Sequence, residues 1–160
     1  MIKHTTLCYI ERDGSYLLLL RNKKERDVNG GKWVGIGGHL EEGEGPEECL
    51  LREVWEETGL TLTDYRAVGD IAFLSDAWPA EIMHLYHASG FSGELTSDCN
   101  EGTLAWVDKR EALSLPMWEG DRLFLAKMEE GGPFFHMILR YCGDTLVESR
   151  VGGRELLLPE

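Results

Sequence analysis

The chain has 160 residues, of which 42% are hydrophobic, which is enough for the core of one domain and argues against disorder. The net charge at pH 7 is −13, from 16 Lys and Arg residues against 29 Asp and Glu residues, and it argues against a polynucleotide partner because phosphate backbones bind basic surfaces. No stretch approaches the roughly 20 apolar residues of a membrane span, and the first residues lack a secretory signal. We therefore expect a cytoplasmic protein that does not bind membranes.

The chain begins with a predicted β-hairpin. Two strand-like runs, residues 5–12 and 15–21, flank Asp13-Gly14, a dipeptide that favours a tight hairpin turn. The run from Tyr16 to Leu20 is almost entirely apolar, which predicts a strand covered on both faces.

A polar loop and a glycine-rich segment follow this hairpin. Residues 22–31 hold the densest basic group of the chain, in which Lys23 is the candidate for contact with substrate phosphate, although a solvated loop is the simpler interpretation. Residues 32–38 read KWVGIGG, and glycines let a backbone approach a ligand closely and expose N–H groups that bind phosphate. Gly37 and Gly38 are therefore candidates for substrate binding.

A helix is predicted from about Pro46 to Thr58. Proline suits the first turn because its missing N–H needs no partner there, and Glu47 and Glu48 follow at the positive end of the helix dipole. Gly59 can adopt the left-handed conformation that commonly ends a helix.

Three acids of this helix lie on one side. Glu53, Glu56 and Glu57 are spaced i, i+3 and i+4, so they fall within an arc of roughly 100°. Like charges at this spacing repel, and a hard divalent cation with oxygen ligands would offset the repulsion. A solvated acidic face, with Arg52 paired to Glu48, is the alternative. An adjoining apolar arc is predicted to face the core, and it contains Leu50, Leu51, Val54 and Trp55.

The wider spacing decides between these interpretations. From Gly38 to Leu60 the sequence follows G-x5-E-x7-R-E-V-x-E-E-x-G-L, with Glu44 as the first acid. This pattern resembles the Nudix box, the signature of the Nudix hydrolase superfamily, at every fixed position. The resemblance implies an α+β fold, an α/β/α sandwich in which a mixed central sheet carries the Nudix loop and helix, followed by a C-terminal helix and hairpin.

The same resemblance implies a site for Mg²⁺ or Mn²⁺. Arg52 would orient a glutamate of the helix, because Glu56 is its i+4 neighbour. Glu101 stands just before a strand-like run that contains Trp106, and the resemblance places this acid near the metals as a ligand or base. The predicted metal ligands are Gly38, Glu44, Glu53, Glu56, Glu57 and Glu101. The predicted catalytic residues are Arg52, Glu53, Glu56, Glu57 and Glu101.

The second half of the chain alternates between strands and helices. Strands are predicted at residues 67–74, 81–88 and 103–107, with a short helix at 109–113 and a longer one from about Trp118 or Glu119 to 130. A last hairpin turns at Gly143-Asp144. Residues 1–151 are expected to form a single domain, and residues 152–160 a tail.

The last helix and hairpin are similar to those of the MutT-like oxidised-purine nucleoside triphosphatases. In that group a tryptophan stacks on the base and an acid reads the purine edge, roles that would fall here to Trp118 and Asp121, although Trp118 as a core residue at a helix start is an equal interpretation. The chain departs from the mammalian members at Gly120, where they carry an acid, and at Val34, where they carry an asparagine. Both departures remove polar groups that could read a base.

The resemblance implies Mg²⁺-dependent hydrolysis of a nucleoside triphosphate to a nucleoside monophosphate and pyrophosphate, with sanitation of the nucleotide pool through 8-oxo-dGTP as the expected role. One alternative is a Nudix hydrolase of another nucleoside diphosphate derivative, such as a nucleotide sugar or dinucleoside polyphosphate. Another is a Nudix-fold binding module without catalysis. The partner is expected to be such a small molecule, and the protein to be a monomer or homodimer.

Overall fold

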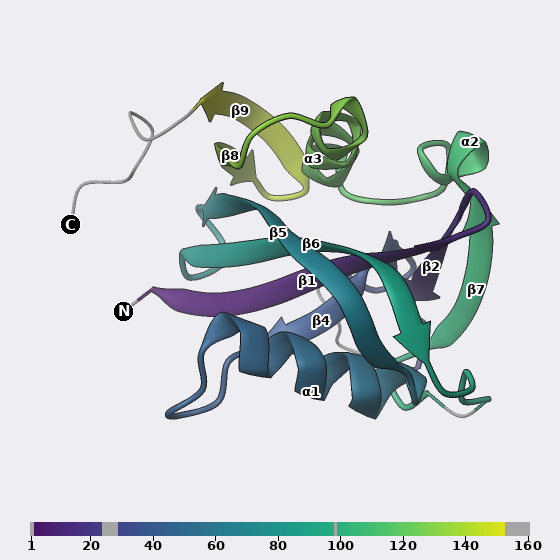
Figure 1. The fold of residues 1–160 in the computed structure, drawn as a ribbon. Helices are drawn as coiled ribbons and strands as arrows, with labels where there is room; N and C mark the ends of the chain where they lie inside the picture. Colours follow the sequence, from purple (N-terminus) through teal and green to yellow (C-terminus); the bar gives the residue numbers. More distant parts are fainter. Residues whose placement is uncertain (1, 24–28, 98, 153–160) are drawn as a thin grey trace.

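The computed structural model describes residues 2–23, 29–97 and 99–152, which form nine strands and three helices (Figure 1). The helices are α1 (Pro46–Thr58), α2 (Lys109–Ala112) and α3 (Glu119–Glu130). The strands are β1 (Lys3–Arg12), β2 (Ser15–Leu20), β3 (Trp33–Val34), β4 (Ile36–His39), β5 (Thr61–Ser75), β6 (Glu81–Ser92), β7 (Thr103–Asp108), β8 (Phe135–Cys142) and β9 (Thr145–Gly152).

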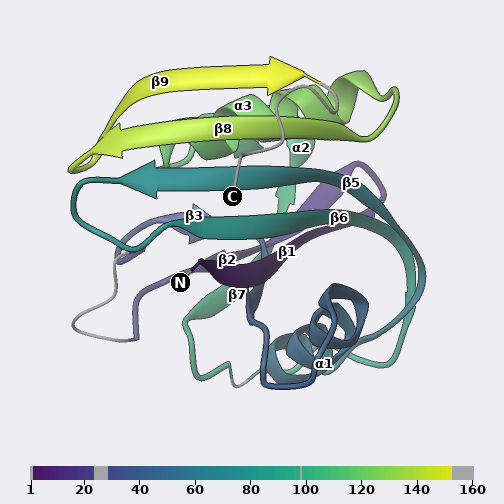
Figure 2. The ribbon, with the colours of Figure 1, turned by 90° about the vertical axis from the view of Figure 1, so that its left-hand side faces the viewer.

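The strands form one mixed sheet in the order β3-β2-β1-β6-β5-β8-β9, with β4 paired to β1 and β7 paired to β2. Strands β1 and β6 run parallel, as do β5 and β8, while the other pairs are antiparallel. Helix α1 lies on one side of the sheet and α3 on the other (Figures 1 and 2). The predicted α+β sandwich is therefore confirmed. No helix of the described residues is long and apolar enough to span a membrane.

The core consists of two clusters, one on each face of the sheet. Alternate residues of β2 divide between them, since Tyr16 and Leu18 join the cluster beneath α3, while Leu17 and Leu19 join the cluster beneath α1. This arrangement follows from the period of two along a strand and confirms that β2 is covered on both faces.

Helix α1 begins and ends as predicted, but its apolar face differs from the prediction. Gly59 has φ of 79°, and its N–H donates to the Trp55 carbonyl. The side chains of Leu51 and Trp55 are 37% and 62% exposed, so the prediction that both face the core was wrong. The buried arc runs instead through Cys49, Leu50 and Val54, with Glu57 near its middle.

The remaining elements lie close to their predicted positions. Strands β5 and β6 are longer than predicted, because their antiparallel pairing continues through irregular register as far as Thr61 and Ser92. Helices α2 and α3 are confirmed, and so is the terminal hairpin, where Gly143 has φ of 58° in the turn. The predicted single domain and C-terminal tail stay predictions, because residues 153–160 lie outside the described part of the chain.

Candidate active site

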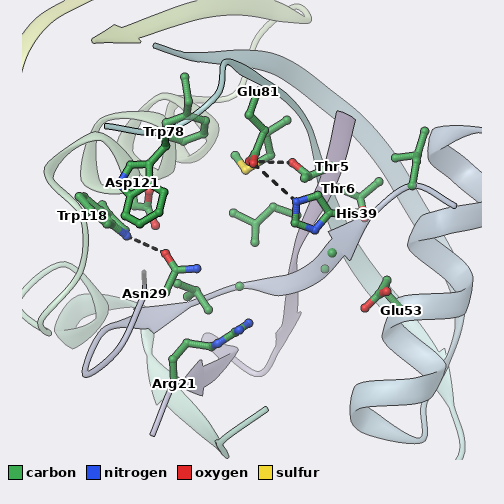
Figure 3. A pocket seen from close by; sticks show the side chains of 18 of the residues that line it. Thr5, Thr6, Arg21, Asn29, His39, Glu53, Trp78, Glu81, Trp118 and Asp121 are labelled. Carbon is green, nitrogen blue, oxygen red and sulfur yellow. Dashed lines mark hydrogen bonds and ion pairs between the residues drawn. The ribbon is translucent and has the colours of Figure 1, made fainter. Parts of the chain in front are cut away.

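A cavity of about 800 Å³ opens between the loop that follows β4 and the start of α3 (Figure 3). One end is lined by acids, Glu53 and Glu57 of α1 together with Glu101, and the other end by Trp118 and Asp121. Elements far apart in the sequence meet here because β1 pairs with both β4 and β6, and β6 pairs with β5.

The two glycines predicted at this site lie where a side chain would meet close neighbours. A Cβ atom on Gly37 would lie 1.9 Å from the Thr6 carbonyl oxygen of the neighbouring strand. A Cβ atom on Gly38 would lie 2.7 Å from the Glu53 carboxylate. Both glycines line the cavity, so the backbone of β4 passes directly beside the acids of α1.

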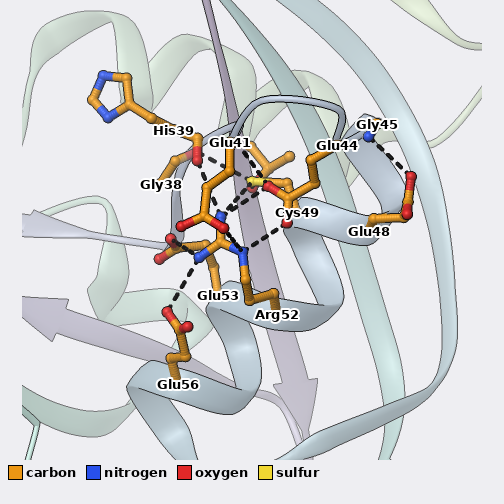
Figure 4. Close-up of polar contacts among 11 residues, drawn as sticks. Gly38, His39, Glu41, Glu44, Gly45, Glu48, Cys49, Arg52, Glu53 and Glu56 are labelled. Carbon is orange, nitrogen blue, oxygen red and sulfur yellow. Dashed lines mark hydrogen bonds and ion pairs between the residues drawn. The ribbon is translucent and has the colours of Figure 1, made fainter.

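Arg52 gathers three glutamates around one guanidinium (Figure 4). It donates to both carboxylate oxygens of Glu44 at 2.7 and 2.9 Å, to Glu53 at 2.7 Å and to Glu56 at 3.2 Å. These bonds agree with the prediction that Arg52 orients glutamates. Hydrogen bonds from Arg52, the largest cause, lower the pKa of Glu44 to about 2, so Glu44 stays ionised.

Glu48 and Glu44, the acids at and before the start of α1, accept hydrogen bonds from nearby backbone N–H groups. The alternative pairing of Arg52 with Glu48 was wrong, because Glu48 instead accepts the Gly45 N–H at 3.0 Å and caps the start of α1. Glu44 lies before the helix and accepts the Glu41 N–H at 2.9 Å, a contact that orders the loop. Neither Glu44 nor Glu56 is among the described residues that line the cavity.

Glu57 is buried in an unusual way for a carboxylate. Its side chain is only 5% exposed, and neither oxygen has a hydrogen-bond partner among the described residues. Burial, with smaller contributions from Glu53 and Glu101, raises its pKa well above the ordinary value. An unpartnered buried carboxylate is costly, and a bound cation is one way to compensate it.

This donor set fits a hard divalent cation, because Glu53, Glu57 and Glu101 all offer oxygen ligands at one end of the same cavity. Within the described residues, however, no three His, Cys, Asp or Glu side chains are already arranged around one point. On α1 the carboxylates do not converge on one point because Arg52 binds Glu53 and Glu56 and holds them toward Glu44.

Among the described residues, a positive charge in the cavity comes from a residue that the sequence did not single out. Arg21 follows β2, lines the cavity and forms an ion pair with Glu101 at 3.1 Å. The only feature of the sequence that could have identified Arg21 is its position as a basic residue at the end of an apolar strand. Lys23, the predicted phosphate contact, does not line the cavity among the described residues. Its ammonium donates to the Cys99 carbonyl at 2.6 Å and so fixes the loop that precedes Glu101.

Trp118 and Asp121, the two residues predicted to contact the base, line the other end of the cavity. The Trp118 indole N–H donates to the Asn29 side-chain oxygen at 2.7 Å, and the Lys32 ammonium lies 4.4 Å from the centre of the Trp118 ring. Asp121 is only 5% exposed, and burial raises its pKa to about 7. Asn29 and the exposed Trp78 of the β5–β6 loop also line the cavity and were not identified from the sequence.

The two positions at which the chain departs from the mammalian enzymes, Gly120 and Val34, have clear structural consequences. The Gly120 N–H donates to the Tyr141 hydroxyl at 2.8 Å. A Cβ atom on Gly120 would lie 2.5 Å from Leu139 and 2.8 Å from the Tyr141 hydroxyl oxygen, so this position has no room for an acid. Val34 contributes an apolar wall to the cavity.

Comparisons with known proteins agree with this architecture. The NUDIX domain family matches residues 1–128. An uncharacterised Nudix hydrolase, YvcI of Bacillus subtilis, is 30% identical over 144 residues, covering 88% of this chain and 87% of the relative. The oxidised purine nucleoside triphosphate hydrolase of Danio rerio is 30% identical over 151 residues, covering 93% and 94%. The crystal structure of a MutT protein from Bacillus halodurans superposes with a TM-score of 0.84 at 27% identity, covering 94% and 97%. The chain therefore belongs to the Nudix hydrolase family.

Proposed function

We propose that the protein hydrolyses a nucleoside triphosphate to a nucleoside monophosphate and pyrophosphate, with oxidised purine triphosphates such as 8-oxo-dGTP as substrates and sanitation of the nucleotide pool as the role. The observation that carries this proposal is the single cavity that joins the acids Glu53, Glu57 and Glu101 to Trp118 and Asp121. A nucleotide has phosphates at one end and a base at the other, and the cavity offers matching chemistry at its two ends. Relatives named as oxidised purine nucleoside triphosphate hydrolases support the same substrate class.

At the acidic end, Mg²⁺ or Mn²⁺ would be held by Glu53, Glu56 and Glu57, with Gly38, Glu44 and Glu101 completing the site. Such a cation would neutralise phosphate charge and lower the pKa of the attacking water. Glu56 and Glu101 are the two candidates for the general base. Glu101 lines the cavity and Glu56 does not, which favours Glu101 as the acceptor of the water proton. Arg21 holds Glu101 and adds a positive charge toward the phosphates.

At the other end, the Trp118 ring offers a surface on which a base stacks. Asp121 can present a neutral carboxylic acid below about pH 7, since burial raises its pKa. A neutral acid both donates and accepts hydrogen bonds, which suits the edge of a purine. The protein would act on such nucleotides in the cytoplasm as a monomer or homodimer, and the net charge of −13 disfavours a polynucleotide substrate.

The test is hydrolysis of 8-oxo-dGTP, the four dNTPs, a nucleotide sugar and a diadenosine polyphosphate, with Mg²⁺ and separately with EDTA. Products are followed by chromatography, because the last two compounds release no pyrophosphate. We expect nucleoside monophosphate and pyrophosphate from triphosphates only with Mg²⁺. Glu53→Gln should lower turnover about a hundredfold or more, while the exposed control Glu148→Gln leaves it unchanged.

Other outcomes would contradict the proposal in different ways. Faster turnover of the nucleotide sugar or the dinucleoside polyphosphate would assign the cavity to another diphosphate linkage. An absence of metal-dependent turnover for every compound would contradict the proposal and favour either an untested diphosphate substrate or a nucleotide-binding module without catalysis.

A further inference from the structure

Three histidines and an aspartate form a row across four neighbouring strands of the sheet (Figure 2). The members of this row are His4 of β1, His84 of β6, Asp70 of β5 and His136 of β8. The described lining of the cavity includes none of them. Successive side chains of a strand point to opposite faces, and Met83 and Leu85, the neighbours of His84, belong to the core cluster beneath α3. The row therefore lies on the other face of the sheet, the face on which α1 packs.

Within this row, the imidazole rings of His4 and His84 meet nitrogen to nitrogen. The His4 Nδ1 atom and the His84 Nε2 atom are 3.1 Å apart, and the planes of the two rings differ by 16°. Two nitrogen ligands of one tetrahedral cation, each bonded at roughly 2.1 Å, stand about 3 Å from each other. The two nitrogens are therefore already as close as two ligands of one metal ion, on an exposed part of the sheet.

Asp70 determines which nitrogen of His84 faces His4 without a proton. The Asp70 Oδ1 atom lies 3.1 Å from the His84 Nδ1 atom, and the two residues are direct partners in the pairing of β5 with β6. An ionised carboxylate can only accept a hydrogen bond, so His84 carries its proton on Nδ1 and presents a lone pair on Nε2 toward His4. A carboxylate in this position is the usual partner of a metal-binding histidine, because it fixes the tautomer and makes the other nitrogen more basic.

His136 holds Asp70 from the opposite side. Its Nδ1 atom lies 3.7 Å from the Asp70 Oδ2 atom, and the two residues are direct partners in the pairing of β5 with β8. Its ring also packs edge-on against Phe134, with 5.4 Å between the ring centres. In the part of the chain that the structure describes, no set of three His, Cys, Asp or Glu side chains converges on one point. A cation on the histidine pair would therefore complete its coordination with water.

We propose that His4 and His84 bind a divalent transition-metal cation such as Ni²⁺, Cu²⁺ or Zn²⁺ at a site separate from the cavity, with Asp70 as the positioning residue. Imidazole nitrogen suits these cations, whereas Mg²⁺ prefers oxygen ligands such as the acids of the cavity. His4 binds through Nδ1 and carries its proton on Nε2, a change of tautomer that costs little for an exposed side chain. The proposal is independent of the proposed function, because none of its residues belongs to the cavity.

The test is calorimetric titration of the whole chain with Ni²⁺ at neutral pH, with Mg²⁺ in large excess to occupy the acids of the cavity. His4→Gln and His84→Gln should each weaken Ni²⁺ binding about tenfold or more, because each removes one nitrogen ligand. Asp70→Asn should weaken it about tenfold, as is typical when the partner of a metal-binding histidine is lost. The control is His87→Gln, a histidine of the same strand that pairs with Glu11, and it should leave Ni²⁺ binding unchanged.

Two further measurements separate metal binding from folding. Urea midpoints without metal show that each variant is folded, and an unchanged midpoint with weaker Ni²⁺ binding assigns Asp70 to positioning rather than to stability. Electron paramagnetic resonance of bound Cu²⁺ counts the coordinated nitrogens. The wild type should show two imidazole nitrogens at this site, and His4→Gln and His84→Gln should each lose one.

Two results would overturn the proposal. Equal Ni²⁺ affinity of the wild type and both single histidine variants would place the cation elsewhere on the protein. An absence of Ni²⁺ binding by the wild type would mean that the contact between the two rings is only a hydrogen bond. Because no hydrolysis is measured, neither result bears on whether the cavity cleaves a nucleoside triphosphate.

Discussion

The guanidinium of Arg52 binds the carboxylate of Glu44 through two parallel hydrogen bonds of 2.7 and 2.9 Å. This pair clamps the loop before α1 onto the second turn of the helix, and the remaining nitrogen of Arg52 reaches Glu53 at 2.7 Å. The position of a cavity acid is thus set by a residue that is not itself among the described residues lining the cavity.

Replacing Arg52 by lysine should therefore reduce activity while the fold persists. An ammonium group cannot make the forked contact with Glu44 and reach Glu53 at the same time. We expect turnover or Mg²⁺ affinity to fall about 10- to 100-fold, as is typical when a group that orients metal ligands is lost. The measurement is the Mg²⁺ dependence of hydrolysis. Arg110→Lys, at an exposed pair with Asp108, is the matched control, and equal effects of the two substitutions would rule out the orienting role.

Glu57→Gln tests whether the buried carboxylate belongs to a cation site. Its two oxygens have no hydrogen-bond partner among the described residues, so replacing the carboxyl group by an amide should not destabilise the protein in EDTA. Mg²⁺ at a hundredfold excess over its Kd should raise the free energy of unfolding of the wild type by about 2.7 kcal/mol, and that of the variant by much less. Urea unfolding with and without Mg²⁺ measures both. If Mg²⁺ stabilised the wild type and the variant equally, Glu57 would not be a ligand of the cation. Glu130→Gln, at an exposed position, is the control.

Asp121 should make stability depend on pH. Burial, only partly offset by Arg122 and Lys32, raises its folded pKa to about 7 from the ordinary 3.8. The folded state then holds the proton more tightly than the unfolded chain, so the free energy of unfolding decreases as pH rises from about 4 to about 7 and then levels off. The decrease is on the order of 4 kcal/mol, at about 1.36 kcal/mol per unit.

Asp121→Asn cannot titrate, so it should lack this decrease and be more stable than the wild type above about pH 7. Urea midpoints from pH 4 to pH 8 provide the measurement. Parallel pH profiles for the two proteins would show that Asp121 keeps an ordinary pKa.

Gly120→Ala should destabilise the protein, because the new methyl group would meet Leu139 at 2.5 Å and the Tyr141 hydroxyl at 2.8 Å. We expect a loss of about 1 to 3 kcal/mol in the free energy of unfolding, the usual range for overpacking. Glu119→Ala, one residue earlier and exposed, is the control and should change stability by less than about 1 kcal/mol. An unchanged urea midpoint for Gly120→Ala would mean that the neighbouring side chains move aside at little cost.

Much of the fold could be predicted from local sequence signals. Pro46 and Gly59 bound α1, Asp13-Gly14 turns the first hairpin, and the apolar run of β2 is covered on both faces. These features depend on neighbouring residues along the chain, which is why patterns identify them. The exposure of Leu51 and Trp55 could not be predicted in this way, because helical spacing gives the arc of a face but not which side of the helix meets the sheet.

The sequence by itself determined the family and the acidic helix, because the spacing of Gly38, Glu44 and the glutamates up to Glu57 is a property of the chain alone. Only the tertiary structure decided how these residues are arranged. Arg52 binds Glu44, Glu53 and Glu56, whereas the cavity is lined by Glu53 and Glu57 but not by Glu44 or Glu56. The tertiary structure also brought Arg21, Asn29 and Trp78 to the same cavity. Their placement depends on which strands pair and where loops distant in sequence meet, and no local pattern of residue types carries that information.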